Sequence, residues 1–468
     1  MVNIKPIVIE IANDIKLNRS ELSYEMVDQI VLDLTIDNPE YAKALRVNRS
    51  TSGIPKTIKL FSFDGDKLKL PRGYGRKLRQ RLHEHRLSFE VVDKRLTLPA
   101  VDFGSRIQLR EYQKPAVEAL VKEKQGGVVA GCGSGKTMIL LEAMARIRQP
   151  ALWVCHTYEL LNQTVERACQ VFDISREEVG IIADGKVSVG NRLTLALIQT
   201  LSKTDLTKLT DKFGLVAVDE AHHLAARSFF YPIGQFQAMY RLWASATPER
   251  SDGLTEMVFA AGGEIVYTIK QHELPTITPQ LVVVETTFDK HYPADQYPKL
   301  ISDLVSSKER NQTVVQTITA EASGNYSLVL SDRIEHLKTL HEMLRETMPN
   351  KSIDLLTGDM SKKSRDEVMK RVKERQVDIL LATQLAREGL DIVHLNRLYL
   401  TTPKRAPGAV QQEVGRVMRP CLGKKDAVVY DFWDSRSPIL KAQFWKRRDV
   451  YEKLGIKWKV SNVRRPVR

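Results

Sequence analysis

Short apolar runs alternate with longer amphipathic stretches through the middle of the chain. This pattern is typical of buried strands joined by helices, which together form a parallel sheet covered on both faces. We therefore expect an α/β domain over residues 105–280. Its predicted strands are Gly127–Ala130, Ala151–Cys155, Leu193–Ile198, Leu215–Val218 and Arg241–Ser245.

A second series of the same kind follows, and it predicts another α/β domain over residues 301–440. The stretch Thr276–Tyr297 carries several prolines, with a strand at Gln280–Val284, so residues 281–300 are expected to be a connection. The predicted strands of the second series are Ser327–Leu330, Ser352–Leu356, Asp378–Ala382, Arg397–Leu400 and Ala427–Tyr430.

Residues 1–104 show a different pattern. Thr57–Phe63 and Leu87–Val92 predict strands, Asp64–Asp66 predicts a turn, and the basic stretch Arg76–Arg86 predicts a helix. We expect a small α+β accessory domain here. The predicted fold class is therefore α/β, with two tandem parallel-sheet domains behind a small α+β domain.

Composition agrees with a folded protein of several domains. At roughly 150 residues per domain, 468 residues suggest about two to four domains. Hydrophobic residues make up 43% and charged residues 27%, which is ordinary for a globular protein. No apolar run approaches the ~20 residues of a membrane span, and the acid-containing N-terminus does not resemble a signal peptide. We expect a monomer in the cytoplasm of a bacterium or a phage-infected host, or in the nucleus if the source is eukaryotic, with no membrane partner.

The cysteines do not predict a structural site. Cys132, Cys155, Cys169 and Cys421 are scattered, without CxxC spacing or a histidine at metal-ligand distance. We expect free thiols in a reducing compartment and neither a disulfide framework nor a zinc site.

The net charge of +14 is concentrated in two places. Residues 43–86 hold thirteen lysines and arginines against three acids, and residues 441–468 hold ten against two. Basic surface of this kind suits a polyanion such as DNA or RNA, and the alternative is a solvated basic face. We expect the domain at residues 1–104 to bind DNA and residues 441–468 to form a basic C-terminal segment.

The first candidate site follows the predicted strand Gly127–Ala130. The loop Ala130–Thr137 is rich in small residues, and the apolar stretch Met138–Ala145 predicts a helix after it. Small residues let backbone N–H groups close around phosphate oxygens, and the helix N-terminus adds positive charge. In this P-loop pattern Lys136 reaches the β- and γ-phosphates and the Thr137 hydroxyl binds Mg²⁺, which predicts ATP or GTP binding. The loop residues expected at the phosphates are Gly131, Gly133, Ser134 and Gly135.

The second candidate site is a pair of acids after the apolar strand Leu215–Val218. Asp219 is expected to hold Mg²⁺, and Glu220 to orient and deprotonate the attacking water. Phosphoryl transfer needs metal neutralisation and an in-line nucleophile, and this pair supplies both.

With these motifs the chain resembles the DExH-box, superfamily 2 helicases, over residues 108–419. The resemblance implies two RecA-like domains and a preference for ATP, because Gln113, with Arg110 nearby, matches the segment that reads adenine. Ser245 and Thr247 match motif III, which with His222 would couple the phosphate site to nucleic acid. The remaining residues that the resemblance places at the nucleotide are Gly389 and Asp391 of motif V and Gln412, Arg416 and Arg419 of motif VI.

Motif VI adds positive charge from the second domain. Arg416 and Arg419 are spaced one helical turn apart, so we expect them on one helix face. An arginine placed against a transferred phosphate is worth about 10³–10⁵ in turnover in comparable enzymes. Hydrolysis would then depend on closure of the two domains. The alternative is an ordinary basic helix.

Nucleic-acid contacts are also implied by the resemblance. Hydroxyls and backbone N–H groups suit contacts to phosphates that ignore sequence, although hydroxyl residues at these positions are also typical helix caps. The residues implied are Thr157, Gln199, Thr200, Ser331, Arg333 and Thr383.

The stretch Thr247–Gly253 resembles the XPB/UvsW-like branch, which remodels duplex or branched DNA in repair and recombination. Arg250 matches a loop of that group implicated in strand separation. Phage helicases of this group are similarly short, so the resemblance also implies a phage or bacterial origin. We therefore expect an ATP-dependent DNA helicase or translocase, with an RNA helicase and an ATP-gated clamp as alternatives. Trp153 and Trp243 lie in predicted strands and are expected in the core, not at bases.

Overall fold

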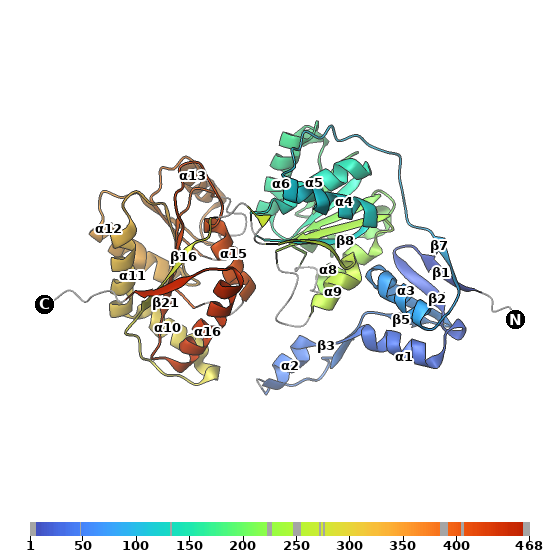
Figure 1. The fold of residues 1–468 in the computed structure, drawn as a ribbon, viewed down its shortest axis with the longest axis horizontal. Coiled ribbons are helices and arrows are strands. Elements are labelled where there is room, and N and C mark those ends of the chain that lie inside the picture. Colours follow the sequence, from blue (N-terminus) through green and yellow to red (C-terminus); the bar gives the residue numbers. More distant parts are fainter. Residues whose placement is uncertain are drawn as a thin grey trace. The chain divides into compact units, whose positions relative to one another are not determined.

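The computed structural model describes residues 6–46, 48–131, 133–221, 227–246, 254–270, 273–274, 277–383, 392–403 and 407–461. The chain divides into two compact units, residues 1–273 and 274–468 (Figure 1). The prediction of two parallel-sheet RecA-like domains with a small mixed-sheet domain at the N-terminus is confirmed.

The N-terminal module is built on a mixed sheet with the strand order β5-β6-β2-β1-β7. Its inward-facing leucines and isoleucines pack against helices α1 (Tyr24–Asp33) and α3 (Gly75–Glu84). The strands are β1 (Ile7–Ile11), β2 (Asp14–Asn18), β5 (Ser62–Asp64), β6 (Lys67–Pro71) and β7 (Phe89–Asp93).

The predicted strand Thr57–Phe63 differs from the structure, which divides it between two sheets. Residues 57–59 form β4 (Thr57–Lys59), which pairs with β3 (Thr35–Asp37) as a separate ribbon around α2 (Pro39–Arg46). Residues 62–64 form β5 and pair with β6. Apolar and polar residues are interspersed through the whole run, but its first half pairs with a strand some twenty residues earlier and its second half with the strand that follows it.

The rest of the first unit is a sheet whose described strands run in the order β11-β10-β12-β9-β13-β14-β8-β15. Every neighbouring pair is parallel except the β10–β11 hairpin. Figure 1 shows α4, α5 and α6 on one face of this sheet and α8 and α9 on the other. The strands are β8 (Gln125–Ala130), β9 (Ala151–Cys155), β10 (Gly180–Ala183), β11 (Lys186–Val187), β12 (Leu193–Leu197), β13 (Leu215–Asp219), β14 (Tyr240–Ser245) and β15 (Ile265–Ile269). The helices are α4 (Lys114–Glu123), α5 (Lys136–Ile147), α6 (Tyr158–Val171), α7 (Ile198–Leu201), α8 (Arg227–Gln235) and α9 (Thr255–Gly262).

Trp153 and Trp243 are fully buried in this unit, as expected from the sequence. The Trp243 ring lies so close to Gly127 on the neighbouring strand that a Cβ there would come within 1.9 Å of it. Its indole N–H donates to the carbonyl of Gly263 at 2.9 Å. Both tryptophans are therefore part of the core.

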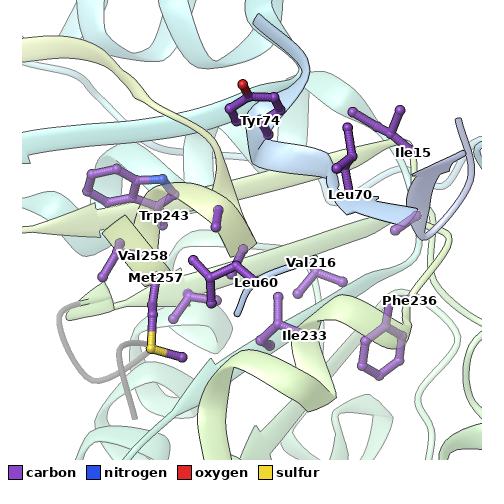
Figure 2. Close-up of a cluster of buried hydrophobic side chains, with 14 of the residues drawn as sticks. Ile15, Leu60, Leu70, Tyr74, Val216, Ile233, Phe236, Trp243, Met257 and Val258 are labelled. Carbon is purple, nitrogen blue, oxygen red and sulfur yellow. The ribbon is translucent and has the colours of Figure 1, made fainter. Parts of the chain in front are cut away.

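The N-terminal module and the eight-stranded sheet share one continuous hydrophobic core. Figure 2 shows Ile15, Leu70 and Tyr74 of the module in the same cluster of buried side chains as Val216 and Trp243 of the sheet, and Leu60 near side chains of α8 and α9. A core shared in this way removes apolar surface of both parts from water, so the two fold against each other as one body.

Two buried arginines add directional contacts to this interface. Arg72 of the module donates to the carbonyls of Ala238 at 2.6 Å and Met239 at 2.9 Å. Arg241 of β14 donates to the carbonyls of Phe236 at 2.6 Å and, within the module, Asn13 at 2.9 Å. Burial lowers the pKa of Arg72 and lowers that of Arg241 to about 9. Each guanidinium therefore depends on backbone carbonyls for the hydrogen bonds that water would otherwise supply.

The second unit contains one sheet whose described strands are all parallel and run in the order β18-β19-β17-β20-β21-β16-β22. The strands are β16 (Gln280–Glu285), β17 (Ser327–Leu330), β18 (Ile353–Leu356), β19 (Ile379–Ala382), β20 (Arg397–Leu400), β21 (Val428–Trp433) and β22 (Trp458–Ser461). The helices are α10 (Tyr297–Ser306), α11 (Lys308–Glu321), α12 (Ile334–Thr347), α13 (Lys362–Lys373), α15 (Pro407–Val417) and α16 (Pro438–Lys453).

Two expected boundaries differ from this structure. Residues 281–300 are not a plain connection, because β16 lies within the second sheet, between β21 and β22. Residues 441–461 of the expected basic C-terminal segment are not separate, because α16 and β22 belong to the second unit. Arg447 of α16 is buried and its guanidinium pairs with Asp431 at 2.8 Å. Part of the C-terminal basic charge is thus used inside the fold.

None of the helices that the structure describes combines the length and the apolarity that a membrane crossing requires.

We predict that Gly73→Ala destabilises the contact between the N-terminal module and α9. A Cβ at this position would lie 1.7 Å from the carbonyl oxygen of Phe259, and backbone cannot rotate away as a side chain can. Overpacking typically costs about 1–3 kcal/mol. We therefore expect the free energy of unfolding of the full chain to fall by about 3 kcal/mol. The measurement is urea denaturation followed by circular dichroism.

The matched control is Gly234→Ala in α8, where a Cβ would meet nothing within 4 Å. Alanine is favoured over glycine inside a helix by up to about 1 kcal/mol, so this variant should be as stable as the parent or more so. Equal unfolding midpoints for the two variants would show that Gly73 is not held in this tight contact.

Candidate functional site

The loop between β8 and α5 has the backbone of an anion site. Gly133 and Gly135 have φ values of 83° and 79°, in the left-handed region that glycine adopts without strain. A Cβ at Gly135 would also lie 2.5 Å from the side-chain nitrogen of Gln113. The loop leads directly into Lys136, the first residue of α5, so the positive end of that helix lies at the loop. Cys132 lies outside the described residues.

A buried hydroxyl in this loop is consistent with a polar ligand. Ser134 is fully buried, and its Oγ has no hydrogen-bond partner among the residues that the structure describes. A buried hydroxyl without a partner costs about 1–3 kcal/mol. Phosphate oxygens accept hydrogen bonds, so the donor set fits a nucleotide phosphate.

The lysine and the acids predicted from the sequence meet at the ends of β8 and β13. The Thr137 hydroxyl donates to Asp219 Oδ2 at 2.9 Å. Lys136 is only 9% exposed, and its Nζ lies 3.7 Å from Glu220 Oε1 and 3.4 Å from the carbonyl oxygen of Ala130. The structure therefore brings together four side chains that are up to 84 positions apart in numbering, from Lys136 to Glu220.

Glu220 occupies its place through an unusual backbone conformation. Its φ is +51°, which is uncommon for a residue with a side chain. The backbone N–H of Glu220 donates to Asp219 Oδ1 at 2.9 Å. The chain thus turns sharply at the end of β13, and both carboxylates stay near Lys136. Strain of this kind is often stored at functional sites.

The negative charge of Asp219 and Glu220 favours binding of a cation. Burial raises the pKa of Asp219, and the negative charge of Glu220 raises it further. Lys136 and the hydrogen bonds from Thr137 and the Glu220 backbone act in the opposite direction. Two adjacent carboxylates with one lysine leave negative charge that a divalent cation can neutralise, and a hydroxyl with a carboxylate suits Mg²⁺.

The segment before α4 is anchored to this loop. Gln113 is buried, its Oε1 accepts from the backbone N–H of Arg110 at 2.9 Å, and its Nε2 donates to the Ser134 carbonyl at 2.8 Å. Both ends of the amide are therefore bonded within the chain, and the reading of adenine by Gln113 stays a prediction. Tyr112, which the sequence analysis did not single out, also donates to the Ser134 carbonyl, at 3.3 Å. Its position as an aromatic residue between Arg110 and Gln113 is the sequence feature that could have identified it.

The motif III residues lie partly outside the described part of the chain. Ser245 ends β14 and is fully buried, on a strand between β13 and β8. His222, Thr247 and Arg250 lie outside the described residues.

Two of the expected phosphate-contacting segments of the first unit lie together. Gln199 Nε2 donates to the carbonyl of His156 at 2.7 Å, which joins the segments after β12 and β9. The Thr157 hydroxyl accepts from the N–H of Leu160 at 3.3 Å and caps α6, so the capping alternative describes this hydroxyl. Thr200 follows Gln199 in α7 and is half-buried. These residues lie at the carboxyl edge of the sheet, as the P-loop does.

In the second unit the hydroxyls expected at nucleic acid are buried. Ser331 Oγ accepts from the N–H of Arg333 at 3.1 Å and lies 3.0 Å from His336 Nδ1, so this hydroxyl is bonded within the chain, although Arg333 and not Ser331 is the N-cap of α12. The other ring nitrogen of His336 lies 3.0 Å from Asn311 Oδ1, and burial lowers the pKa of His336 to about 3. Arg333 is exposed. Thr383 is buried, and its hydroxyl has no hydrogen-bond partner in the described part of the chain.

The motif VI arginines differ from the expected single helix face. Helix α15 ends at Val417, so Arg416 lies in its last turn and Arg419 lies beyond it. Lys424, which the sequence analysis missed, donates to the carbonyls of Val417 at 2.7 Å and Arg419 at 2.9 Å. Burial lowers the pKa of Lys424 to about 8. The side chain of Gln412 and all of Gly389 and Asp391 lie outside what the structure describes.

Comparison with known families covers both units. Residues 106–250 match the family model described as "Type III restriction enzyme, res subunit", and residues 309–421 match "Helicase conserved C-terminal domain". The first span includes the P-loop and the Asp219–Glu220 pair, and the second includes Arg416 and Arg419.

Individual relatives agree in fold and family but differ in the nucleic acid that their names give. The chain is 26% identical to a protein of Acanthamoeba polyphaga mimivirus named "Putative ATP-dependent RNA helicase L396", over 94% of this chain and 86% of that protein. It is 25% identical to "DNA 3'-5' translocase XPB2" of Sulfurisphaera tokodaii, over 72% of this chain and 82% of that protein.

Among solved structures, S. cerevisiae Dbp5 bound to RNA and ADP BeF3 has a TM-score of 0.55 at 14% identity, and the match covers 81% of this chain and 92% of that one. That likeness supports the two-sheet fold. Together with the two family matches and the geometry of the P-loop, it leads to one assignment: the chain is a superfamily 2 helicase, an ATPase whose hydrolysis of ATP depends on nucleic acid.

Proposed function

We propose that this protein is an ATP-driven motor that moves on, or unwinds, duplex or branched DNA. The observation that supports it best is the cluster of Lys136, Thr137, Asp219 and Glu220. The hydrogen bond of 2.9 Å from Thr137 to Asp219 joins the start of α5 to the end of β13. This cluster supplies the chemistry on which the motor depends.

Each side chain of the cluster has a proposed role in hydrolysis. Lys136 binds the β- and γ-phosphate oxygens, and Thr137 and Asp219 hold Mg²⁺, which supplies neutralising charge when it is bound. The Glu220 carboxylate accepts a proton from water as the water oxygen attacks the γ-phosphorus. The bond between that phosphorus and the bridging oxygen of ADP breaks, and phosphate and ADP leave.

Arg416 and Arg419 are proposed to complete this site from the second unit. Planar guanidinium groups bind phosphate oxygens in a bidentate manner and stabilise the charge that develops in the transition state. Because these residues belong to a different unit from the P-loop, turnover would require the two units to close on the nucleotide. The opening and closing would then move the protein along nucleic acid.

DNA is the proposed substrate, and RNA is the alternative. The names of the relatives do not decide between the two, because XPB2 is named for DNA and the mimivirus protein for RNA. The match of residues 106–250 to a restriction-enzyme subunit, a class whose name implies DNA, favours DNA. A third alternative is a clamp that hydrolyses ATP to release nucleic acid without moving along it.

We predict that ATP hydrolysis is stimulated more by forked duplex DNA than by single-stranded DNA or by RNA of the same sequence. The measurement is phosphate release by the purified full chain with each nucleic acid, with strand displacement followed in parallel. Lys136→Ala is the control for the site, and it should abolish turnover because no other lysine lies in the P-loop. Strongest stimulation by RNA would contradict the DNA assignment, and stimulation without strand displacement would favour a translocase or a clamp.

We also predict that Mg²⁺ binding weakens as pH falls. Because the pKa of Asp219 is raised, protons compete for its carboxylate at higher pH than for an ordinary aspartate. Mg²⁺ binds the deprotonated form, so the Mg²⁺ concentration that is needed should rise as the pH is lowered. The measurement is the Mg²⁺ concentration that gives half-maximal binding of a fluorescent, non-hydrolysable ATP analogue.

Asp219→Asn should need more Mg²⁺ at every pH and should lose most of this pH dependence. Asp211→Asn, at an exposed position in the same unit, is the matched control and should behave as the parent protein. The assignment of Asp219 as the Mg²⁺ ligand fails if its asparagine variant keeps the parent pH profile.

A further prediction concerns the second unit. Arg419→Gln should slow turnover by about 10³-fold or more while ATP binding weakens much less, because the guanidinium acts on charge that develops in the transition state. Turnover and analogue binding are measured on the same preparation. Lys425→Gln, which removes one exposed positive charge nearby, is the control. Equal losses in the two variants would count against a role for Arg419 in hydrolysis.

A further inference from the structure

Residues 35–59, which we call the basic arm, stand out from the rest of the N-terminal module. The arm consists of β3, α2, a loop and β4, and its two strands pair only with each other in the described sheets. Figure 1 shows α2 lying apart from the five-stranded sheet of the module. The arm therefore presents most of its surface to solvent.

The arm is held together by its own backbone and by one buried polar side chain. Asn38 is 3% exposed, and its Nδ2 donates to the carbonyl of Pro55 at 2.7 Å, while its Oδ1 accepts from the N–H of Glu40 at 3.1 Å. Its backbone N–H donates to the carbonyl of Lys56 at 3.0 Å. Asn38 thus joins the start of α2 to the end of the loop, so the backbone of the arm is held in one folded element.

The charge of the arm is unbalanced. From residue 41 to residue 63 the sequence contains no aspartate or glutamate. The cations of this stretch are all exposed, and none forms an ion pair with any residue that the structure describes; they are Lys43, Arg46, Arg49, Lys56 and Lys59. The arm as a whole carries these five cations against two acids, Asp37 and Glu40, and its net charge of +3 creates a positive potential that attracts a polyanion.

The neighbouring basic helix α3 provides a contrast within the same module. Lys77 and Arg81 both pair with Asp33, at 3.0 Å and 2.6 Å. Arg76 pairs with Glu123 and Glu264 of the eight-stranded domain. Three cations of the stretch Arg76–Arg86 are thus neutralised inside the fold, whereas Arg79 and Arg86 are exposed. On the arm all five cations are exposed, and none is in an ion pair with a described residue.

The loop of the arm carries the hydrogen-bonding groups that suit a phosphate backbone. Residues 48–53 read Asn-Arg-Ser-Thr-Ser-Gly, and nearly all of them are exposed. Hydroxyls, amides and arginine are the groups that contact phosphate and sugar without reading sequence. These six residues include no large apolar side chain of the kind that anchors a protein partner, although Leu45 of α2 is exposed.

The root of the arm lies on the motor domain. Leu60, the residue after β4, is buried, and Figure 2 shows it among Ile233, Met257 and Val258 of α8 and α9. Helix α9 is the helix that follows the motif III strand β14 in the sequence. Nucleic acid bound by the arm would therefore be held by the same compact unit that contains the P-loop.

We propose that the basic arm binds the phosphate backbone of the nucleic acid on which the motor acts, independently of base sequence. This inference rests on the proposed function for its substrate, and it adds the surface that holds that substrate. The positive charge, the exposed hydroxyls and the anchoring to the motor domain support it together. The arm keeps the P-loop unit attached to the backbone during the nucleotide cycle.

The test is equilibrium binding of a labelled forked DNA duplex by the full chain, followed by fluorescence anisotropy over a series of salt concentrations. The test variant replaces Lys43, Arg46 and Arg49 with glutamine. The control replaces Lys122, Lys124 and Arg148, also with glutamine, at the amino edge of the eight-stranded sheet, where α4 and α5 end. Both variants lose the same charge from the same unit, and unchanged thermal unfolding confirms that each is folded.

Loss of phosphate contacts has a defined signature. Each contact contributes about 0.9 to the slope of log K against log salt concentration, so the arm variant should lose about 2–3 from the magnitude of the slope. Its affinity at about 0.1 M salt should fall by about tenfold or more, whereas the control should bind as the parent does. The same series with an RNA duplex shows which nucleic acid depends more on the arm.

The possible failures are distinguishable. Binding and slope in the arm variant equal to those of the control would overturn the arm proposal, whatever the ATPase does. A second outcome is that the arm variant loses binding as expected, but DNA does not stimulate ATP hydrolysis by the parent protein. That result would overturn the proposed motor and leave the arm as a binding element. Binding of both variants to phosphatidylserine vesicles is measured as well. If the arm variant loses binding to the vesicles but binds both nucleic acids as the control does, the arm proposal is overturned in favour of a membrane surface.

Discussion

The catalytic cluster depends on β8 and β13 ending at the same edge of one parallel sheet. Strand β14 lies between them, and its Trp243 ring packs against Gly127 of β8, where a Cβ would come within 1.9 Å. A slip of one residue in either strand would turn the side chains that follow to the opposite face. Thr137 and Asp219 would then be separated, although they now lie 2.9 Å apart. The packing of the sheet core thus fixes the geometry of the polar site.

Strand β14 also joins the site to the N-terminal module. Arg241, near its start, donates to a carbonyl of the module, and Ser245, at its end, lies at the edge that carries the acids. The helix that follows this strand in the sequence, α9, packs against Gly73 of the module. One strand and one helix therefore link the accessory module to the catalytic edge.

The sequence predicted the buried parallel strands well because burial on both faces leaves an uninterrupted apolar run. Pairing between distant segments is not visible in such a run, so the strand at 280–285 was placed outside the second sheet, and residues 57–63 were not divided between two sheets. The P-loop and the acid pair were found because their spacing is local. Thr157 shows the limit of that approach, since the same hydroxyl suits a helix cap and a phosphate contact, and only the three-dimensional neighbours distinguish the two.

Charge illustrates the same limit more sharply. The guanidinium of Arg81 meets a carboxylate supplied by α1, and that of Arg241 meets carbonyls supplied by distant loops. Arg46 and Arg49 are exposed, and the described residues provide no acid for either. All of them contribute equally to the net charge of the chain, but only the last two can bind a polyanion without first giving up an internal contact. The sum of charges along a segment therefore measures what the fold must neutralise, and the cations left over after folding determine what the surface can bind.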